Sequence, residues 1–453
     1  MITQIIKIKK QLLCFVLILS GITAEAQNNY LDKYVDTALQ NNLVLQRKNI
    51  TIERAQLSLK IAKSYYLPNS SFQMGYQTAD GGRVIPLPLG DMLNGVYSTL
   101  NSITNTQNFP QLANENVQFL PKNFYDAKLH TTMPIYDADI HYGKKLAELQ
   151  VGISEMDLGV YKKDLIRDVK SAYYRYLMAL QTITIYSQAL ALSEESQRVN
   201  QKLLDNGKGL PAYVLRSESE VANVKAQITN ANLQAKNARL YFNFLLNKPL
   251  SDSILVDPLE ENTIAQKTLI YTKNVDVDNR LEIKSLERQQ TINETLIAKN
   301  KAAFYPKLNT FLDLGSQAQD WHFNSQSRYY MFGVQLSVPI YTGSKTRNQI
   351  KQSYLDAKAL SIGIEQAKQQ YSVAAQSAIN NLQSSIESFQ AKQKQLEAAS
   401  SYQRLIERGY KAGSNTYIET IDARSQLTNA SIDKNIQAYQ VLINLAEVER
   451  NIP

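Results

Sequence analysis

Glu419 and Asp422, near the C-terminal end of the chain, form the pair whose type and spacing most suggest chemistry. They are three residues apart, so on a helix both carboxylates lie on one face. The pair sits where a helix is expected to begin, and acids are favoured there by the helix dipole. From the spacing alone, the simplest interpretation is therefore a solvated helix N-terminus.

Residues suited to catalysis or metal binding are otherwise scarce. The 453-residue chain has three histidines (His130, His141 and His322), which are scattered, and one cysteine, Cys14. We find no glycine-rich phosphate loop and no histidine pair with ligand spacing. The sequence therefore predicts no enzyme, no cofactor and no metal site.

The N-terminus reads as an export signal. A basic start with Lys7, Lys9 and Lys10 precedes an apolar stretch over 12–19, and Ala24-Glu25-Ala26 gives the small-x-small cleavage pattern. Residues 1–26 are predicted to be a secretory signal peptide. A membrane anchor is the weaker alternative, because about 20 apolar residues are needed to span a bilayer. Export also argues against nucleic acid as a partner, which the net charge of +8 would permit.

Proline positions predict very long helices. Two stretches, 135–210 and 340–452, lack proline, which costs roughly 3 kcal/mol inside a helix. Two of the helices that follow would each be about 100 Å long at 1.5 Å per residue. Such lengths suit a rod, a coiled coil or a tube. The expected helices cover about 30–65, 137–205, 211–247, 276–303, 342–408 and 414–449.

Four segments between the helices alternate apolar and polar residues. Period-two alternation over about ten residues is typical of a membrane strand, with the apolar side toward lipid. Each segment alone would better suit a half-buried strand in a soluble sheet. The signal peptide and the long helices favour the membrane interpretation. The segments are 69–78, 124–136, 307–316 and 328–341.

The chain repeats one pattern of helix, two strands and long helical hairpin. The prolines Pro68, Pro134, Pro306 and Pro339 mark the helix–strand junctions, where proline disfavours helix in the residue before it. We expect a first repeat over 27–250, an equatorial linker over 251–275 and a second repeat over 276–453.

Four strands cannot close a membrane barrel, which needs at least eight. A closed oligomer is therefore expected, and strand count alone permits a dimer or a trimer. The connections 79–123 and 317–327 are expected on the outside, since such barrels have long extracellular loops. The longer one is interpreted as a solvated insertion, with a fold over the pore mouth as the alternative.

With these features in place, the chain resembles the TolC-like outer-membrane efflux proteins. The most specific match is Gly409-Tyr410-Lys411-Ala412-Gly413-Ser414-Asn415-Thr416-Tyr417, continuing through Glu419 to Asp422-Ala423. A looser match runs from Gly207 to Glu218, and it has Tyr213 where the family usually has Asp. The family's Arg is absent at Asn415.

The resemblance implies a mainly α fold with a membrane β-barrel. Duplicated long-helix hairpins would form an α-barrel tunnel, and four strands per protomer would give a twelve-stranded barrel in a homotrimer. Such a protein would lie in the outer membrane of a Gram-negative bacterium, among its lipids, and extend into the periplasm. It would be the exit duct of a tripartite efflux or type I secretion system. Its partners would be a periplasmic adaptor (membrane fusion) protein and an inner-membrane pump of the RND or ABC type.

The resemblance also assigns roles to the hairpin ends. Glu419 and Asp422 would form acidic rings at a periplasmic gate, since such rings favour cations in a narrow lumen. Exposed small residues at the two ends would let an adaptor approach closely. These docking residues would be Gly207, Gly209, Leu210, Ala212, Gly409, Ala412, Gly413 and Ser414.

The main rival function is an exported coiled-coil structural or periplasmic adaptor protein without a pore. It explains the helices and the signal peptide. It does not explain four membrane-type strands at repeat-related positions. Drug, metal and protein cargo are all compatible with the channel interpretation.

Overall fold

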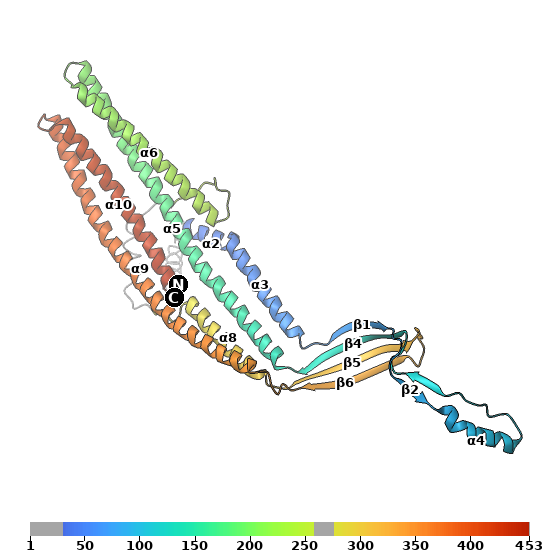
Figure 1. Cartoon of the computed structure of the whole chain (residues 1–453). Coiled ribbons are helices and arrows are strands. Elements are labelled where there is room, and N and C mark those ends of the chain that lie inside the picture. Colours follow the sequence, from blue (N-terminus) through green and yellow to red (C-terminus); the bar gives the residue numbers. More distant parts are fainter. Residues whose placement is uncertain (1–29, 258–275, 453) are drawn as a thin grey trace, which may run out of the picture. The chain divides into compact units, whose positions relative to one another are not determined.

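A computed structural model describes residues 30–257 and 276–452 (Figure 1). The predicted signal peptide lies outside the described residues, as does most of the predicted linker 251–275. The chain divides into two compact units. The first draws on Met1–Arg54, Val151–Gln290 and Ala359–Pro453, and the second on Ala55–Gln150 and Thr291–Lys358. Each unit therefore takes segments from both predicted repeats.

The helices agree closely with the expected ones. The two longest, α5 and α9, have 68 and 67 residues, which is about 100 Å each at 1.5 Å per residue. Among the described residues, every helix is too short or too polar to span a bilayer. The bounds are α2 (Tyr30–Asn41), α3 (Leu43–Ser64), α5 (Ala138–Asp205), α6 (Pro211–Leu245), α8 (Leu281–Ala302), α9 (Lys345–Lys411) and α10 (Tyr417–Asn451).

The single helix expected over about 30–65 is wrong, because Asn42 divides it into α2 and α3. The Asn42 Oδ1 atom accepts hydrogen bonds from the backbone N–H groups of Val44 (2.9 Å) and Leu45 (3.2 Å). Its Nδ2 atom donates to the Leu245 carbonyl at 3.0 Å. An asparagine that satisfies the first N–H groups of a helix acts as an N-cap, so α3 starts anew here.

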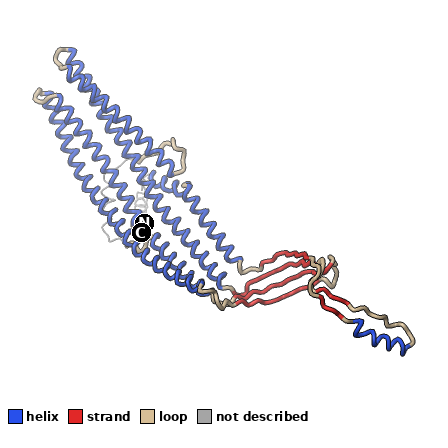
Figure 2. The backbone as a smooth tube through the Cα atoms, in the orientation of Figure 1, coloured by secondary structure: helices blue, strands red, loops and turns tan. Residues whose placement is uncertain are grey.

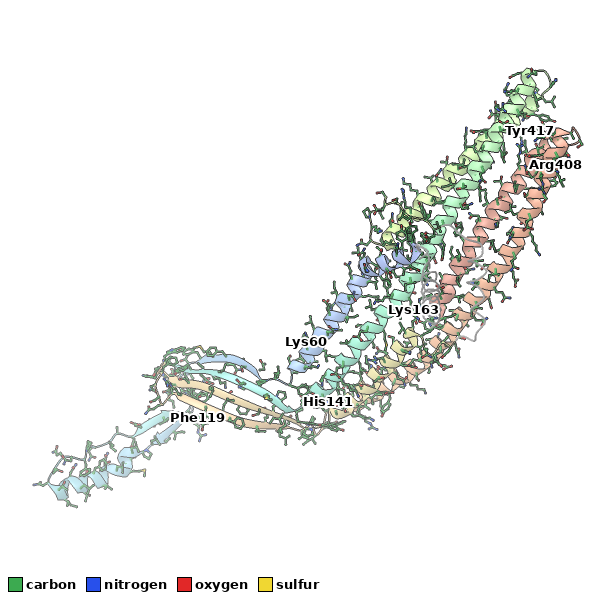
Figure 3. All side chains as sticks on the ribbon, turned by 180° about the vertical axis from the view of Figure 1, so that it is seen from behind. Lys60, Phe119, His141, Lys163, Arg408 and Tyr417 are labelled. Carbon is green, nitrogen blue, oxygen red and sulfur yellow. The ribbon has the colours of Figure 1, made fainter. Side chains whose placement is uncertain are left out.

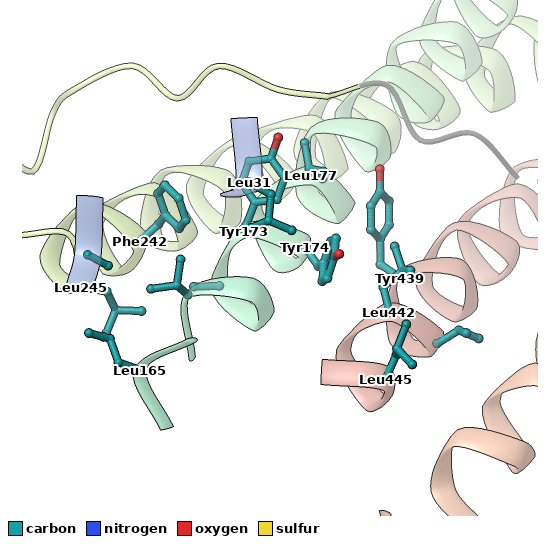
Figure 4. Packing of buried hydrophobic residues seen from close by; sticks show 14 of the residues in the cluster. Leu31, Leu165, Tyr173, Tyr174, Leu177, Phe242, Leu245, Tyr439, Leu442 and Leu445 are labelled. Atoms are coloured by element: carbon teal, nitrogen blue, oxygen red, sulfur yellow. The ribbon is translucent and has the colours of Figure 1, made fainter. Parts of the chain in front are cut away.

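One hydrophobic cluster holds the first unit together (Figure 4). Tyr173 of α5 and Phe242 of α6 are almost wholly buried, at 1% and 0% exposed, and Leu442 of α10 joins them. Tyr34 of α2 meets Phe242 edge to face at 5.0 Å. Burying such side chains stabilises by about 1.5–3 kcal/mol each. The cluster therefore fixes α2, α5, α6 and α10 around one core.

A buried charge network fixes the end of α10. Glu282 accepts hydrogen bonds from Arg280 (3.0 Å) and Arg450 (2.6 Å), and Arg450 also contacts Asp164 of α5 at 2.5 Å. The Arg280 side chain, 3% exposed, lies 4.5 Å from the ring centroid of Tyr371 in α9. Burial alone raises the pKa of Glu282, but the two arginines outweigh it and lower the pKa to about 2.

The second unit contains a four-stranded antiparallel sheet in the order β1-β4-β5-β6 (Figure 2). All four expected strands are confirmed, with β5 longer and β6 shorter than predicted. Strands β1 and β6 pair on one side only, so both sheet edges are open in the protomer. The bounds are β1 (Asn69–Gln77), β4 (Phe124–Tyr136), β5 (Lys307–Gln319) and β6 (Arg328–Ser337).

One face of this sheet is apolar and exposed. The strand register places Phe72, Leu129, Leu314 and Tyr330 in one row across all four strands. Their exposed fractions are 71%, 43%, 48% and 78%. The neighbouring row, Ser71, His130, Asp313 and Met331, belongs to the opposite face. The predicted alternation is thus expressed as two chemically different faces.

The insertion 79–123 is not a plain loop. It forms the hairpin strands β2 (Val84–Leu87) and β3 (Glu115–Gln118) and the 16-residue helix α4 (Leu89–Thr104). The predicted solvated insertion therefore has secondary structure of its own, and most of its residues are exposed. A helical signal was present in the sequence, because Leu89, Met92, Leu93, Val96, Leu100 and Ile103 recur at three- and four-residue steps.

We expect acidic pH to lower the unfolding stability of the first unit, because Glu282 becomes protonated. The lowered pKa means that the network stabilises fully above about pH 4.3, the ordinary value, and less as the pH falls toward 2. Urea unfolding followed by circular dichroism should show this loss. Glu282→Gln should lower the free energy of unfolding by about 2 kcal/mol at neutral pH. The stability of this variant should also depend less on pH in the acidic range.

The matched control is Glu195→Gln, which removes an exposed carboxylate paired with Arg198. It should leave the unfolding free energy nearly unchanged, because exposed ion pairs contribute little. Equal effects of the two variants would contradict a special role for the buried network.

Candidate functional site

The first hairpin end closes through a glycine at the C-terminus of α5. Gly207 has φ +67° and donates its N–H to the Leu204 carbonyl at 2.8 Å. The next N–H, from Lys208, reaches the Leu203 carbonyl at 2.8 Å. This pair of bonds is a Schellman motif, which satisfies carbonyls at a helix end. A Cβ atom on Gly209 would lie 2.6 Å from the Leu204 backbone nitrogen, so glycine is required there too.

The second hairpin end uses the same motif at Gly413, because α9 runs to Lys411, three residues beyond the expected end at 408. Gly413, with φ +79°, donates to the Tyr410 carbonyl at 3.1 Å, and Ser414 donates to the Gly409 carbonyl at 2.8 Å. Gly409 itself lies in the last turns of α9, where a Cβ atom would collide with the Asn415 side chain. Gly413 is therefore the structural counterpart of Gly207.

Three tyrosines join the two hairpins near their ends, and sequence analysis missed them as a group. Tyr417, 3% exposed, lies 5.1 Å from Tyr213 and 6.1 Å from Tyr410 between ring centroids. The Tyr417 hydroxyl is hydrogen-bonded to Ser196 of α5 at 2.9 Å. Figure 3 labels Tyr417 and Arg408 at this end of the second hairpin. Tyr213, which replaces the family's Asp, thus makes an aromatic contact.

Glu419 caps the start of α10 together with Thr416, the N-cap residue. Its carboxylate accepts hydrogen bonds from the Thr416 backbone N–H (2.7 Å) and the Asn415 amide (3.1 Å), while Thr416 Oγ1 accepts the Glu419 N–H at 3.3 Å. This reciprocal pair is a capping box. The two bonds to the carboxylate lower the pKa of Glu419.

Asp422 lies one turn further along α10 and accepts a hydrogen bond from Gln426 at 2.8 Å. Glu419 and Asp422 are both exposed in the protomer, on the same side of α10. The structure therefore brings the two predicted gate acids together. Glu419 also caps the helix, which agrees with the interpretation of this pair as a solvated helix N-terminus.

The other predicted docking residues are divided between the two ends. Leu210 is the N-cap of α6 and is 55% exposed, and Ala212 follows in the first turn. Ala412 and Ser414 are exposed beside Gly413. All four present small or apolar surface at the hairpin ends, where their docking role stays a prediction.

Three of the four predicted junction prolines lie between helix and strand. Pro68 and Pro306 directly precede β1 and β5, and Pro339 follows β6. Pro134 instead lies inside β4, where the pairing with β5 shifts register between Pro134 and Tyr136. Proline lacks the N–H group that a regular ladder needs, so a bulge accommodates it.

The polar face of the sheet carries a compact charged group. Lys128 lies 3.4 Å from Asp313 and 3.7 Å from Asp126, and the Tyr329 hydroxyl donates to Asp126 at 2.8 Å. His130 contacts the same Asp313. Among residues 30–257 and 276–452, no three His, Cys, Asp or Glu side chains gather as metal ligands would.

This combination of long helical hairpins and an open-edged antiparallel sheet is similar to that of known outer-membrane proteins. Residues 277–451 match the family model "Outer membrane efflux protein". The chain is 24% identical to outer membrane protein TolC of Escherichia coli over 347 residues, which cover 72% of this chain and 69% of TolC. It is 21% identical to the alkaline protease secretion protein AprF of Pseudomonas aeruginosa, over 51% of this chain and 49% of AprF.

Solved structures share the fold. The CmeC outer membrane channel of Campylobacter jejuni matches with a TM-score of 0.74 at 16% identity, covering 93% of this chain and 85% of CmeC. The predicted resemblance to the TolC-like outer-membrane efflux proteins is confirmed, and so is the predicted outer-membrane location.

Removing the cap hydroxyl should loosen the start of α10. Thr416→Ala is expected to cost about 1 kcal/mol locally, which corresponds to roughly fivefold faster hydrogen exchange in the first turn of α10. Thr416→Ser keeps the hydroxyl and is the matched control. Unchanged exchange in Thr416→Ala would show that the capping box does not hold this end.

Proposed function

We propose that this protein is an outer-membrane channel-tunnel, which conducts substrates passively from the periplasm to the exterior. The observation that carries the proposal is the sheet: a full row of apolar side chains is exposed on one face, and charged groups gather on the other. Apolar residues toward lipid and polar residues toward a lumen are the pattern of a membrane barrel wall.

The open edges of the sheet support closure by several copies. Backbone groups on β1 and β6 that face away from the sheet need partners, and lipid offers none. Three protomers would supply twelve strands, and the family resemblance favours this homotrimer. Exposed aromatic residues at the helix–strand junctions, such as Tyr65 (62%) and Tyr305 (49%), would lie at the membrane interface.

The hairpin ends are the proposed docking and closing region. A periplasmic adaptor would contact the exposed small residues there, and an RND or ABC pump in the inner membrane would supply energy and most selectivity. The relatives include a TolC protein and a protein named for alkaline protease secretion. Efflux and type I secretion are therefore both open for this duct.

Glu419 and Asp422 are the proposed periplasmic gate. Three copies of each would make two acidic rings, whose negative potential favours cations in a narrow lumen. Because its pKa is lowered, Glu419 keeps its charge at a lower pH than an ordinary glutamate.

The channel proposal is tested by planar-bilayer conductance of protein purified without its signal segment, with the particle mass measured by light scattering. Trimers that give small, cation-selective currents are expected. A non-conducting species that is soluble without detergent would sink the proposal and favour a coiled-coil adaptor instead.

The gate is tested by Glu419→Ala combined with Asp422→Ala. Roughly threefold larger currents and weaker cation preference are expected, because the constriction loses its charge. Asp205→Ala with Glu218→Ala removes two acids near the first hairpin end and serves as the control. Equal effects of the two double variants would place the gate elsewhere.

A further inference from the structure

Helix α4 presents an uncovered apolar stripe in the insertion that joins β1 to β4. The stripe consists of Met92, Val96, Thr99 and Ile103, and we name it the α4 seam. Met92, Val96 and Ile103 are 69%, 54% and 75% exposed. Their spacing of four, three and four residues is the heptad pattern by which helices pair with other helices.

The opposite side of α4 is already occupied by its own return segment. Asn94 exchanges two hydrogen bonds with the Leu112 backbone (2.9 and 2.7 Å), and Asn101 does the same with Phe109 (2.8 and 3.0 Å). A Cβ atom on Gly90 would lie 2.4 Å from the Leu112 carbonyl oxygen. The helix is thus held in a fixed rotation that turns the seam outward.

Charge argues for another protein helix rather than a lipid surface as the occupant. The only charged residue of α4 is Asp91, and Asn114 donates a hydrogen bond to it at 2.9 Å. Helices that lie on membranes usually carry Lys and Arg along the polar face, and α4 has neither. A neutral seam meets no repulsion from an identical seam. Gly95 beside it has open space around its Cβ position, which permits close approach.

We infer that α4 helices from neighbouring copies of this chain pair along the α4 seam into a parallel bundle. The inference rests on the proposed oligomeric channel. Sixteen residues are too few for a stable isolated bundle in water. Tethering within one oligomer raises the effective concentration to about millimolar, which compensates. The insertion starts from β1, an open edge strand where a neighbouring copy is expected to pair.

Cysteine cross-linking tests the inference in the intact protein. The chain's only cysteine, Cys14, lies in the predicted signal peptide. Purified Val96→Cys and Thr99→Cys proteins should form covalent dimers on copper–phenanthroline oxidation. The matched control is Ser102→Cys, an exposed position on the same helix outside the seam. The seam positions should give at least about tenfold more dimer.

The same samples are checked for mass and conductance, which separates the two hypotheses. Conducting trimers with no preferential seam cross-link would overturn the α4 pairing and leave the channel intact. Particles that are not oligomeric would overturn the channel proposal itself.

A lipid occupant gives a different signal. Val96→Cys labelled with bimane should keep its emission when phosphatidylethanolamine–phosphatidylglycerol vesicles are added. A blue shift that appears only with vesicles would assign the seam to lipid and overturn the pairing.

Discussion

The unpaired edges of the four-stranded sheet are the constraint on which the rest of the molecule depends. Strands β1 and β6 each pair with a single neighbour, and the face they share exposes aromatic and aliphatic side chains. An apolar environment would suit that face but would leave the edge backbone groups without partners. Only further strands can satisfy both requirements. The sheet therefore supports the proposal that several copies of this chain assemble.

The first unit solves a different problem, which is how to fix long helices that have little core. Its hydrophobic cluster gathers α2, α5, α6 and α10, and the arginine–carboxylate network ties α10 to α5 and α8. Buried ion pairs add little net stability over apolar packing, but breaking one is costly. Arg450 bonds both Asp164 and Glu282, and Arg280 bonds the Asn451 carbonyl, so both arginines tie α10 to its neighbours.

Helix lengths and strand alternation were predictable because each depends on local pattern. Proline-free stretches predicted α5 to within one residue and α9 to within three residues at each end, and period-two segments predicted all four strands of the sheet. Errors arose where one side chain competes with the backbone pattern. Asn42 interrupts a periodic helix by capping a new one, and α9 passes Gly409 to end at Lys411. The helix of the insertion was missed although its apolar residues recur at helical spacing, and asparagine contacts with the return segment 105–114 hold it in place. The tyrosine group at the hairpin ends likewise depends on contacts between hairpins.

At the hairpin ends, tyrosine side chains hold the two hairpins together and acidic side chains supply exposed charge. Contacts between the hairpins use the rings of Tyr213, Tyr410 and Tyr417 and one hydroxyl bond to Ser196. Burial raises the pKa of Tyr410 above its ordinary value near 10, so the Tyr410 hydroxyl stays neutral across physiological pH. The acids Glu419 and Asp422 lie outside it, exposed on α10. Changes in salt therefore act on the exposed acids while the aromatic contact between hairpins is preserved. Charge at this end can respond to its surroundings without loosening the protomer that carries it.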